Sequence, residues 1–339
     1  MTWIRVAVQA HGGHGATQID LDFARKGAAK RLFPVDDRFD PAAKQAALLR
    51  AAHDELALLL AKPLAPGLYL VATPIGHLGD ITLRALATLA TADVVYCEDT
   101  RHSRKLLDRY NLRSTLRAYH EHNASEARPA ILAELGRGAR VALVSDAGTP
   151  LISDPGYKLV RMVLAEGGRV FGIPGASATL TALVASGLPT DCFTFAGFLP
   201  VKAGARAERL AQLAAAPGTL VLFEAPGRVA ATLAAMTDIY GSVTPAAIGR
   251  ELTKLHEEMR TGTLAELAAW ADADDLRGEV VILVAPLRDG AREVTDAVIL
   301  AALTAGAGAS LRDRVDAVAA SLGAPKKRVY ALALKGLGT

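Results

Sequence analysis

Residues 140–156, RVALVSDAGTPLISDPG, indicate how this chain folds. The stretch opens with four apolar residues, Val141 to Val144, which is the length and composition of a short buried strand. A polar loop follows, and the stretch closes around Asp154-Pro155, where Asp can cap a helix and Pro suits its first position. Strand, loop and helix in this order are typical of an open α/β sheet, which binds ligands beyond the carboxyl ends of its strands.

The same alternation continues on both sides of this stretch, from Gly67 to about residue 187. Apolar, strand-like runs recur at 68–73, 94–97, 116–119 and 169–173, and a helical pattern follows each of them. One of these helices is expected at 82–89, with Asp80 as its cap. Helices between successive strands imply crossover connections, so we predict a mostly parallel sheet in a first α/β domain at 67–187.

The pattern changes after Leu188-Pro189. Strand-like runs at 193–198, 219–226, 246–250 and 279–285 show no dominant crossover pattern. This favours a second α/β domain at 188–286, with a mixed sheet and helices on one side.

Both ends of the chain differ from these two domains. Residues 1–63 are expected to form an N-terminal extension, in which Asp40-Pro41 opens a helical stretch. Residues 295–339 predict a small helical C-terminal module with two helices, the second of which begins with Lys and Arg. Such a pair suits either contact with nucleic acid or packing on the body or on a dimer mate.

Composition narrows the class of protein. Of 339 residues, 51% are apolar and 22% charged, which indicates well-filled cores and argues against disorder. The formal charge of +3 excludes a strongly basic nucleic-acid coat protein, so any RNA contact has to come from local patches. The histidines of HGGHG (11–15) lack cysteine or carboxylate partners, and no metal site is predicted. Without a signal-peptide pattern or a long apolar run, we expect a cytoplasmic protein with no membrane partner.

Four loops of the first domain follow strand ends in the same sense, at 73–80, 98–105, 145–156 and 174–178. In a parallel sheet they gather at the carboxyl edge. Neither a P-loop nor G-x-G-x-x-G is present, which argues against polyphosphate and dinucleotide ligands. Carboxylates can hold hydroxyl and ammonium groups, and helix amides can hold a carboxylate. This lining suits a ligand with an adenine, a ribose and an amino-acid end.

Six blocks of sequence resemble the ribosomal RNA small subunit methyltransferases of the tetrapyrrole methylase family. They are TPIGHLGDIT (73–82), EDTRHSRKLL (98–107), YHEHN (119–123), LVSDAGTPLISDPGYKLV (143–160), PGASATLTALVASGLPTDCFTFAGFLP (174–200) and RELTKLHEE (250–258). The resemblance implies S-adenosylmethionine as methyl donor and 2′-O-methylation of a cytidine in 16S rRNA, at the decoding region of the small subunit. It also implies two α/β domains with the donor in the cleft between them, and a homodimer. His77, Ala176 and Gly227 depart from the usual pattern, but none of them replaces a carboxylate.

The residues predicted for the donor site come from these blocks. They are Pro74, Gly76, Asp146, Ala147, Gly148, Ile152, Ser153 and Ser177. Asp146 is the most specific of them, because a carboxylate directly after an apolar strand has few other uses. Its alternative role is to cap the local turn.

Methyl transfer to a ribose hydroxyl needs an in-line approach and removal of the hydroxyl proton. The candidates for that base, or for orienting the ribose, are Glu98, Asp99, His120 and Glu251. Burial after a strand would raise the pKa of Glu98 or Asp99, whereas their alternative role is to hold Arg101 or Arg104. The sequence does not decide among them, and catalysis by positioning alone stays open.

Three basic clusters are candidates for contact with RNA phosphates, or else solvated helix faces. They are Arg101, Arg104 and Lys105; Lys202, Arg206 and Arg209; and Lys326 to Arg328. The first lies beside the predicted donor site. Two other functions remain alternatives, a methylase of a small tetrapyrrole and a non-catalytic RNA-binding factor of ribosome assembly.

Overall fold

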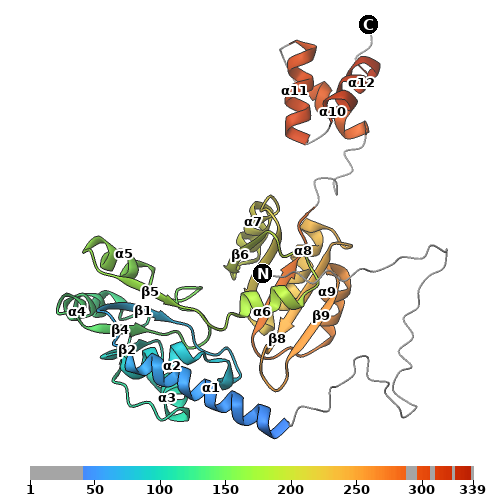
Figure 1. Cartoon of the computed structure of the whole chain (residues 1–339). Coiled ribbons are helices and arrows are strands. Elements are labelled where there is room, and N and C mark those ends of the chain that lie inside the picture. Colours follow the sequence, from blue (N-terminus) through green and yellow to red (C-terminus); the bar gives the residue numbers. More distant parts are fainter. Residues whose placement is uncertain (1–40, 288–295, 306–309, 323–324, 337–339) are drawn as a thin grey trace, which may run out of the picture. The chain divides into compact units, whose positions relative to one another are not determined.

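The computed structural model describes residues 41–287, 296–305, 310–322 and 325–336 (Figure 1). Residues 1–51 and 52–339 form separate units. Helix α1 (Pro41–Ala61) is the helical stretch expected in the N-terminal extension, and Leu48 and Leu49 on it are exposed. Asp40 and the HGGHG segment lie outside the described residues. The domain boundaries given above stay predictions.

The first sheet is parallel throughout, as predicted, and has the order β3-β2-β4-β1-β5. Its strands are β1 (Gly67–Val71), β2 (Val94–Cys97), β3 (Leu116–Ala118), β4 (Arg140–Leu143) and β5 (Val170–Ile173). Between and after them run η1 (Leu78–Asp80), α2 (Leu83–Thr91), α3 (Thr100–Arg109), α4 (Ala124–Gly136), α5 (Tyr157–Ala165) and α6 (Ala178–Ala185). Because β4 is inserted between β2 and β1, the loops that follow β4 and β1 are neighbours.

Alternation along the strands gives this sheet two buried faces. Leu68 and Val141 pack with Ile131 of α4 and Leu159 of α5 on one face. On the other face, strand residues such as Val71, Val95 and Cys97 pack with Ala85 and Leu89 of α2 and Leu107 of α3. Because both faces are covered, a ligand can bind this sheet only at an edge, and open α/β sheets bind ligands at the carboxyl edge.

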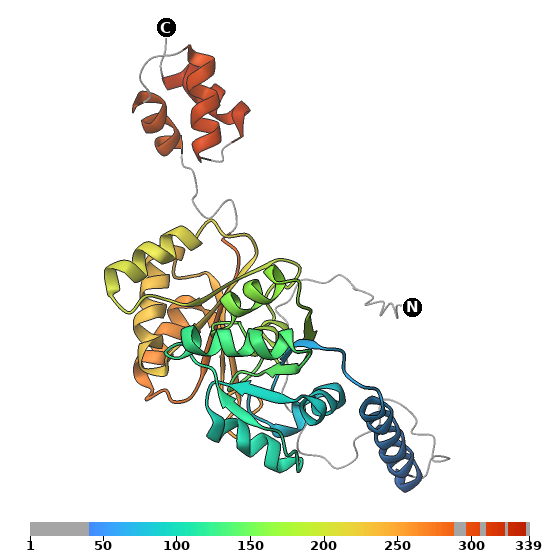
Figure 2. The same cartoon turned by 90° about the vertical axis from the view of Figure 1, so that its left-hand side faces the viewer.

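The second sheet is mixed, again as predicted, with the order β6-β7-β10-β8-β9. Its strands are β6 (Phe193–Phe198), β7 (Thr219–Glu224), β8 (Pro245–Arg250), β9 (Glu258–Thr263) and β10 (Val280–Val284). Only β6 and β7 pair in parallel. Helices α7 (Ala203–Leu213), α8 (Val229–Tyr240) and α9 (Leu264–Ala273) cover one face, and α8 follows the short helix η2 (Pro226–Arg228) (Figures 1 and 2).

The opposite face of the second sheet packs against the loop after β1 and against helix α6. Val221, Ala247 and Leu283 share a buried cluster with Ile75, from the loop after β1, and with Leu183 of α6. The sheet therefore forms one wall of whatever lies beside α6.

Three expectations from the sequence were wrong. Helix α5 begins at Tyr157 after Gly156, whose φ of 146° favours glycine, so Asp154 and Pro155 do not start it. Asp80 ends η1, and the side chain of Thr82 caps α2 instead, by accepting the amide of Ala85 at 3.1 Å. The C-terminal module has three helices and not two, α10 (Asp296–Ala305), α11 (Leu311–Leu322) and α12 (Lys326–Gly336), packed around a core of their own.

Within the described residues, no helix is long and apolar enough to cross a membrane.

Candidate active site

A cavity of about 440 Å³ lies where the loop after β4 faces the second sheet. Volumes of this size are usual for small-molecule sites. Its walls come from both sheets. They are Ile75, Asp146–Thr149, Ile152–Asp154, Ser177–Thr179, Phe198, Phe223–Pro226 and Gly278–Val281.

The loop after β4, residues 145–156, is held by the loop after β1. The amide of Thr73 donates to the carbonyl of Gly148 at 2.9 Å, and the amide of Gly148 donates back at 3.0 Å. Leu151 and Ser153 have φ values of 74° and 67°, which cost free energy in residues with a side chain. Strain of this kind gathers at functional sites, and here it orients the segment that carries Asp154.

Three carboxylates gather at this edge of the sheet, and none of them pairs with a Lys or Arg of the described residues. Burial, and then the charge of Asp146, raises the pKa of Glu98. Burial, and then the charge of Glu98, raises the pKa of Asp154 to about 6. No described Lys or Arg forms an ion pair with Glu98, Asp146 or Asp154. The site therefore favours a positively charged ligand.

The neighbours Glu98 and Asp99 differ in role. Asp99 accepts the amide of Arg101 at 2.8 Å and pairs with its guanidinium, which lowers the pKa of Asp99 to about 2. Its own amide donates to Asp146 Oδ1 at 3.0 Å. Asp99 thus fills the structural role that was one alternative, and Glu98 has the raised pKa that was the other.

His120 is close enough to Glu98 to lower the pKa of that carboxyl. The Nδ1 atom of His120 is buried and has no hydrogen-bond partner among the described residues. Of the candidate bases, Glu98 and His120 therefore lie together, on the loops after β2 and β3.

Glu251 has a structural task. Its carboxylate pairs with Lys254 at 2.8 Å and accepts the amide of Glu279 at 2.9 Å. The hydrogen bond from Lys254 lowers the pKa of Glu251, which makes it a weak base. Glu251 instead fixes Gly278 and Glu279, which line the cavity.

The predicted phosphate contacts differ in exposure. Arg101, Arg104 and Lys105 are exposed on α3, directly after Glu98 and Asp99, although Arg101 pairs with Asp99. Lys202 and Arg209 are exposed on or before α7. Arg206 is only 9% exposed, so it is not placed to bind a phosphate at the surface, and the expectation for it is not supported.

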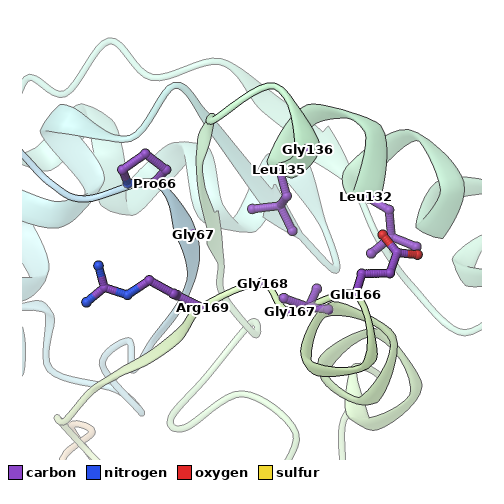
Figure 3. Close-up of a pocket in the computed structure, with 10 residues that line it drawn as sticks. Pro66, Gly67, Leu132, Leu135, Gly136, Glu166, Gly167, Gly168 and Arg169 are labelled. Carbon is purple, nitrogen blue, oxygen red and sulfur yellow. The ribbon is translucent and has the colours of Figure 1, made fainter.

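A second cavity, of about 310 Å³, lies at the opposite edge of the first sheet, beside the start of β1 and the ends of α4 and α5 (Figure 3). Its charged lining residues are Glu166 and Arg169, whose side chains extend away from each other in Figure 3. Leu132, Leu135 and Val163 supply apolar wall. Without convergent polar groups, it is the weaker candidate for an active site.

Residues 67–268, more than half of the chain, match the family model described as Tetrapyrrole (Corrin/Porphyrin) Methylases. The chain belongs to the tetrapyrrole methylase family. Methylases of this family take their methyl group from S-adenosylmethionine, and the two sheets described above are the family's α/β fold.

Two relatives with high sequence identity to this methylase are named ribosomal RNA small subunit methyltransferase I. A ribosomal RNA small subunit methyltransferase I from Mesorhizobium japonicum is 61% identical over 237 residues, which are 70% of this chain and 81% of that protein. Its namesake from Vibrio cholerae is 46% identical over 231 residues, 68% of this chain and 80% of that protein. A conserved hypothetical protein from Aeropyrum pernix K1 resembles it in structure, with a TM-score of 0.51 and 19% identity over 81% of this chain and 97% of that chain. This last likeness concerns the fold alone.

The cavity of the methylase fits its donor. Thr179 is only 6% exposed and lines the cavity, and its hydroxyl is buried without a partner among the described residues, which is the kind of polar atom that a bound molecule satisfies. Asp146 and Asp154 suit the positive charges of the donor's sulfonium and ammonium groups.

Six of the eight predicted donor residues line this cavity, and Pro74 and Gly76 do not. Gly76 serves another purpose, because a Cβ there would come within 2.8 Å of Thr253 Oγ1 and 3.1 Å of the Leu252 carbonyl. Sequence reasoning missed Asp154 and Thr179 as lining residues, and also the wall from the second sheet around Phe223.

Proposed function

We propose that this methylase transfers a methyl group from S-adenosylmethionine to the 2′-hydroxyl of a cytidine in 16S rRNA, at the decoding region of the small ribosomal subunit. Relatives named ribosomal RNA small subunit methyltransferase I, up to 61% identical to this chain, support the RNA substrate. The observation that carries the chemistry is the group of Glu98, Asp146 and Asp154, without a described Lys or Arg as ion-pair partner, beside a cavity of suitable size.

Different residues of the chain would bind different groups of the donor. Asp146 and Asp154 would hold its cationic groups. The amino end of α6, capped by Ser177 and carrying the unpaired hydroxyl of Thr179, would hold its carboxylate. Phe198 and Phe223, whose ring centroids lie 5.7 Å apart, offer an apolar wall for the adenine. When bound, the donor supplies a methyl group activated by a positively charged sulfur.

The residues proposed to remove the proton of the ribose hydroxyl lie on the loops after β2 and β3. Glu98 has a raised pKa and no cation partner, so its carboxylate is the better base of the candidates named above. His120 lies near it and lowers the pKa of Glu98, which favours the ionised carboxylate that a base needs. General base catalysis of this kind contributes about 10²- to 10⁴-fold, and positioning supplies the larger part of the rate.

The acceptor RNA would lie along α3. Arg104 and Lys105 are exposed in the second turn of α3, which begins directly after Glu98 and Asp99, so phosphates bound there would bring a ribose toward the carboxylates. A substrate in the ribosome implies action in the cytoplasm.

A homodimer completes the proposal. Helix α6 contains no charged residue, and Leu180 and Val184, one turn apart on it, are 50% and 74% exposed. Exposed apolar side chains on an uncharged helix favour contact with another protein surface, here a second copy of the chain.

One assay separates this function from its two rivals. The protein is incubated with S-adenosylmethionine labelled in its methyl group and with intact small subunits, naked rRNA or tetrapyrrole precursors. Label in RNA supports the proposal, label in the precursors alone supports a small-molecule methylase, and binding to subunits without transfer supports an assembly factor. A Glu98→Gln variant should transfer label more slowly even at saturating donor, because the proposed base is lost.

A further inference from the structure

The C-terminal module accounts for the positive charge of the whole chain. Residues 296–336 contain six Lys and Arg and three Asp, which give +3, and the other 32 basic and 32 acidic residues of the chain balance. The methylase family model ends at residue 268, before this module begins. The methyl-transfer fold therefore does not explain why the module is present or why it is basic.

Ion pairs within the module decide which of its cations remain available. Lys326 pairs with Asp316 at 3.0 Å, and Arg328 pairs with Asp296 at 2.7 Å. Lys327 lies between them, is exposed, and forms no ion pair with any described residue. Exposed pairs contribute little to stability, so Lys326 and Arg328 can exchange their carboxylates for phosphates when a polyanion approaches.

Helix α12 has an inner and an outer face. Val329 and Ala333 are buried in the core of the module. Lys327, Tyr330 and Leu334 follow one another at helical spacing on the other side, where Tyr330 is 46% and Leu334 57% exposed. An exposed aromatic ring next to a free cation, on a helix that opens with three basic residues, is the combination that binds a nucleotide by its base and its phosphate.

We propose that the outer face of α12, made of Lys327, Tyr330 and Leu334, docks single-stranded RNA of the substrate. Tyr330 stacks on an unpaired base, Lys327 contacts the adjoining phosphate, and Leu334 packs on the edge of the base or sugar. Single-stranded RNA is the fitting form, because the major groove of an RNA duplex is too narrow for a helix to read. The inference rests on the proposed function, for which it supplies a second RNA contact distinct from α3.

The test uses the full chain and single, exposed substitutions, which leave the core of the module untouched. Lys327→Gln and Tyr330→Ala are compared with wild type, with the conservative variants Lys327→Arg and Tyr330→Phe, and with Lys62→Gln. Lys62 is an exposed lysine outside the module and outside the active site, so this control removes the same charge elsewhere. Affinity for naked 16S rRNA and for intact small subunits is measured over a range of salt concentrations, together with kcat, KM and donor affinity.

The expected result separates docking from catalysis. Tyr330→Ala should weaken RNA binding about 5- to 100-fold and raise KM for RNA, with kcat and donor affinity unchanged, and Tyr330→Phe should restore binding. Lys327→Gln should lower the slope of log affinity against log salt by about one, whereas Lys327→Arg and Lys62→Gln should not.

Three outcomes would overturn the proposal. Equal RNA affinity and equal salt slopes in Tyr330→Ala, Lys327→Gln and Lys62→Gln would discard the docking face while methyl transfer by the wild type stood. Weaker binding to subunits with unchanged binding to naked rRNA would assign the face to a ribosomal protein. A wild-type protein that neither binds nor methylates RNA would remove the proposed function itself.

Discussion

At the scale of single residues, substitution of Asp146 has the clearest expected effect. Asp146 follows the buried end of β4, lines the cavity and accepts the amide of Asp99. Asp146→Ala should weaken donor binding about 10- to 100-fold, because a hydrogen bond to a charged group is worth about 1.5–3 kcal/mol. Asp146→Asn keeps an acceptor for the amide of Asp99 and removes the charge. Calorimetry should find both variants impaired, and an Asn variant that binds like wild type would show that the charge is not used.

Asp154 should make stability depend on pH. Its pKa rises from 3.8 in a model carboxyl to about 6 in the native state, chiefly through burial. The native protein therefore binds more protons than the unfolded chain between these values. The contribution of this carboxyl is fully present below pH 3.8 and is lost as the pH rises through about 6.

Asp154→Asn removes that titration and keeps the shape of the side chain. Urea unfolding measures the free energy of unfolding of both proteins at about pH 5 and at about pH 8. The value for the variant minus the value for wild type should be larger at the higher pH. An equal difference in unfolding free energy at the two pH values would mean that Asp154 titrates normally.

At the scale of elements, contact between the loop after β1 and residues 252–254 fixes how the two sheets lie against each other. The amide of His77 donates to Thr253 Oγ1 at 3.0 Å, and Gly76 leaves no room for a Cβ beside Leu252 and Thr253. Gly76→Ala should cost about 1–3 kcal/mol of unfolding free energy through overpacking, and it should also weaken donor binding, since Ile75 beside it lines the cavity.

Gly204→Ala is the matched control for that prediction. A Cβ at Gly204, in α7, meets nothing within 4 Å, and alanine favours a helix by about 0.8–1.0 kcal/mol over glycine. Chemical unfolding should therefore move in opposite directions for the two variants. A Gly76→Ala protein as stable as Gly204→Ala would show that the contact does not constrain the loop.

The elements that the sequence predicted are those with a strong apolar period. Val280 to Val284 and the strands β1, β2 and β4 are largely buried apolar runs, and the structure has them as strands. Strand β9 reads EMRTGT and lies at the edge of its sheet with its side chains partly exposed, so it carries no such signal.

The site was predictable only where it follows a strand end. Asp146, Gly148 and Ser177 could be named because their loops gather at one edge of a parallel sheet. Asp154 was read as a helix cap, because the turn that ends in Gly156 at φ 146° has no sequence signature stronger than Asp-Pro. Phe223 and Gly278 reach the cavity through the packing of two sheets, which local sequence does not encode.

At the scale of the whole molecule, the exposed apolar face of α6 should be covered by a second copy. Val184→Asp places a charge at a side chain that is 74% exposed in the single chain. Analytical ultracentrifugation should find the wild type dimeric and the variant shifted toward monomer, because a buried unpaired charge is costly. Thr181→Asp, on the same helix, introduces the same charge on a partly buried polar position and tests whether any charge on α6 has this effect. A monomeric wild type would contradict the dimer.

The cavity at the carboxyl edge is proposed to deliver a methyl group to a ribose oxygen of ribosomal RNA. The most direct test of this proposal is to methylate small subunits that lack the modification, using the wild-type protein, and to digest the RNA to nucleosides for mass spectrometry. We expect one new product, 2′-O-methylcytidine, mapped to the decoding region and formed about 10- to 100-fold more slowly by Asp146→Ala at limiting donor concentration. A methyl group on a base, or transfer that is unaffected by Asp146→Ala, would contradict the proposal.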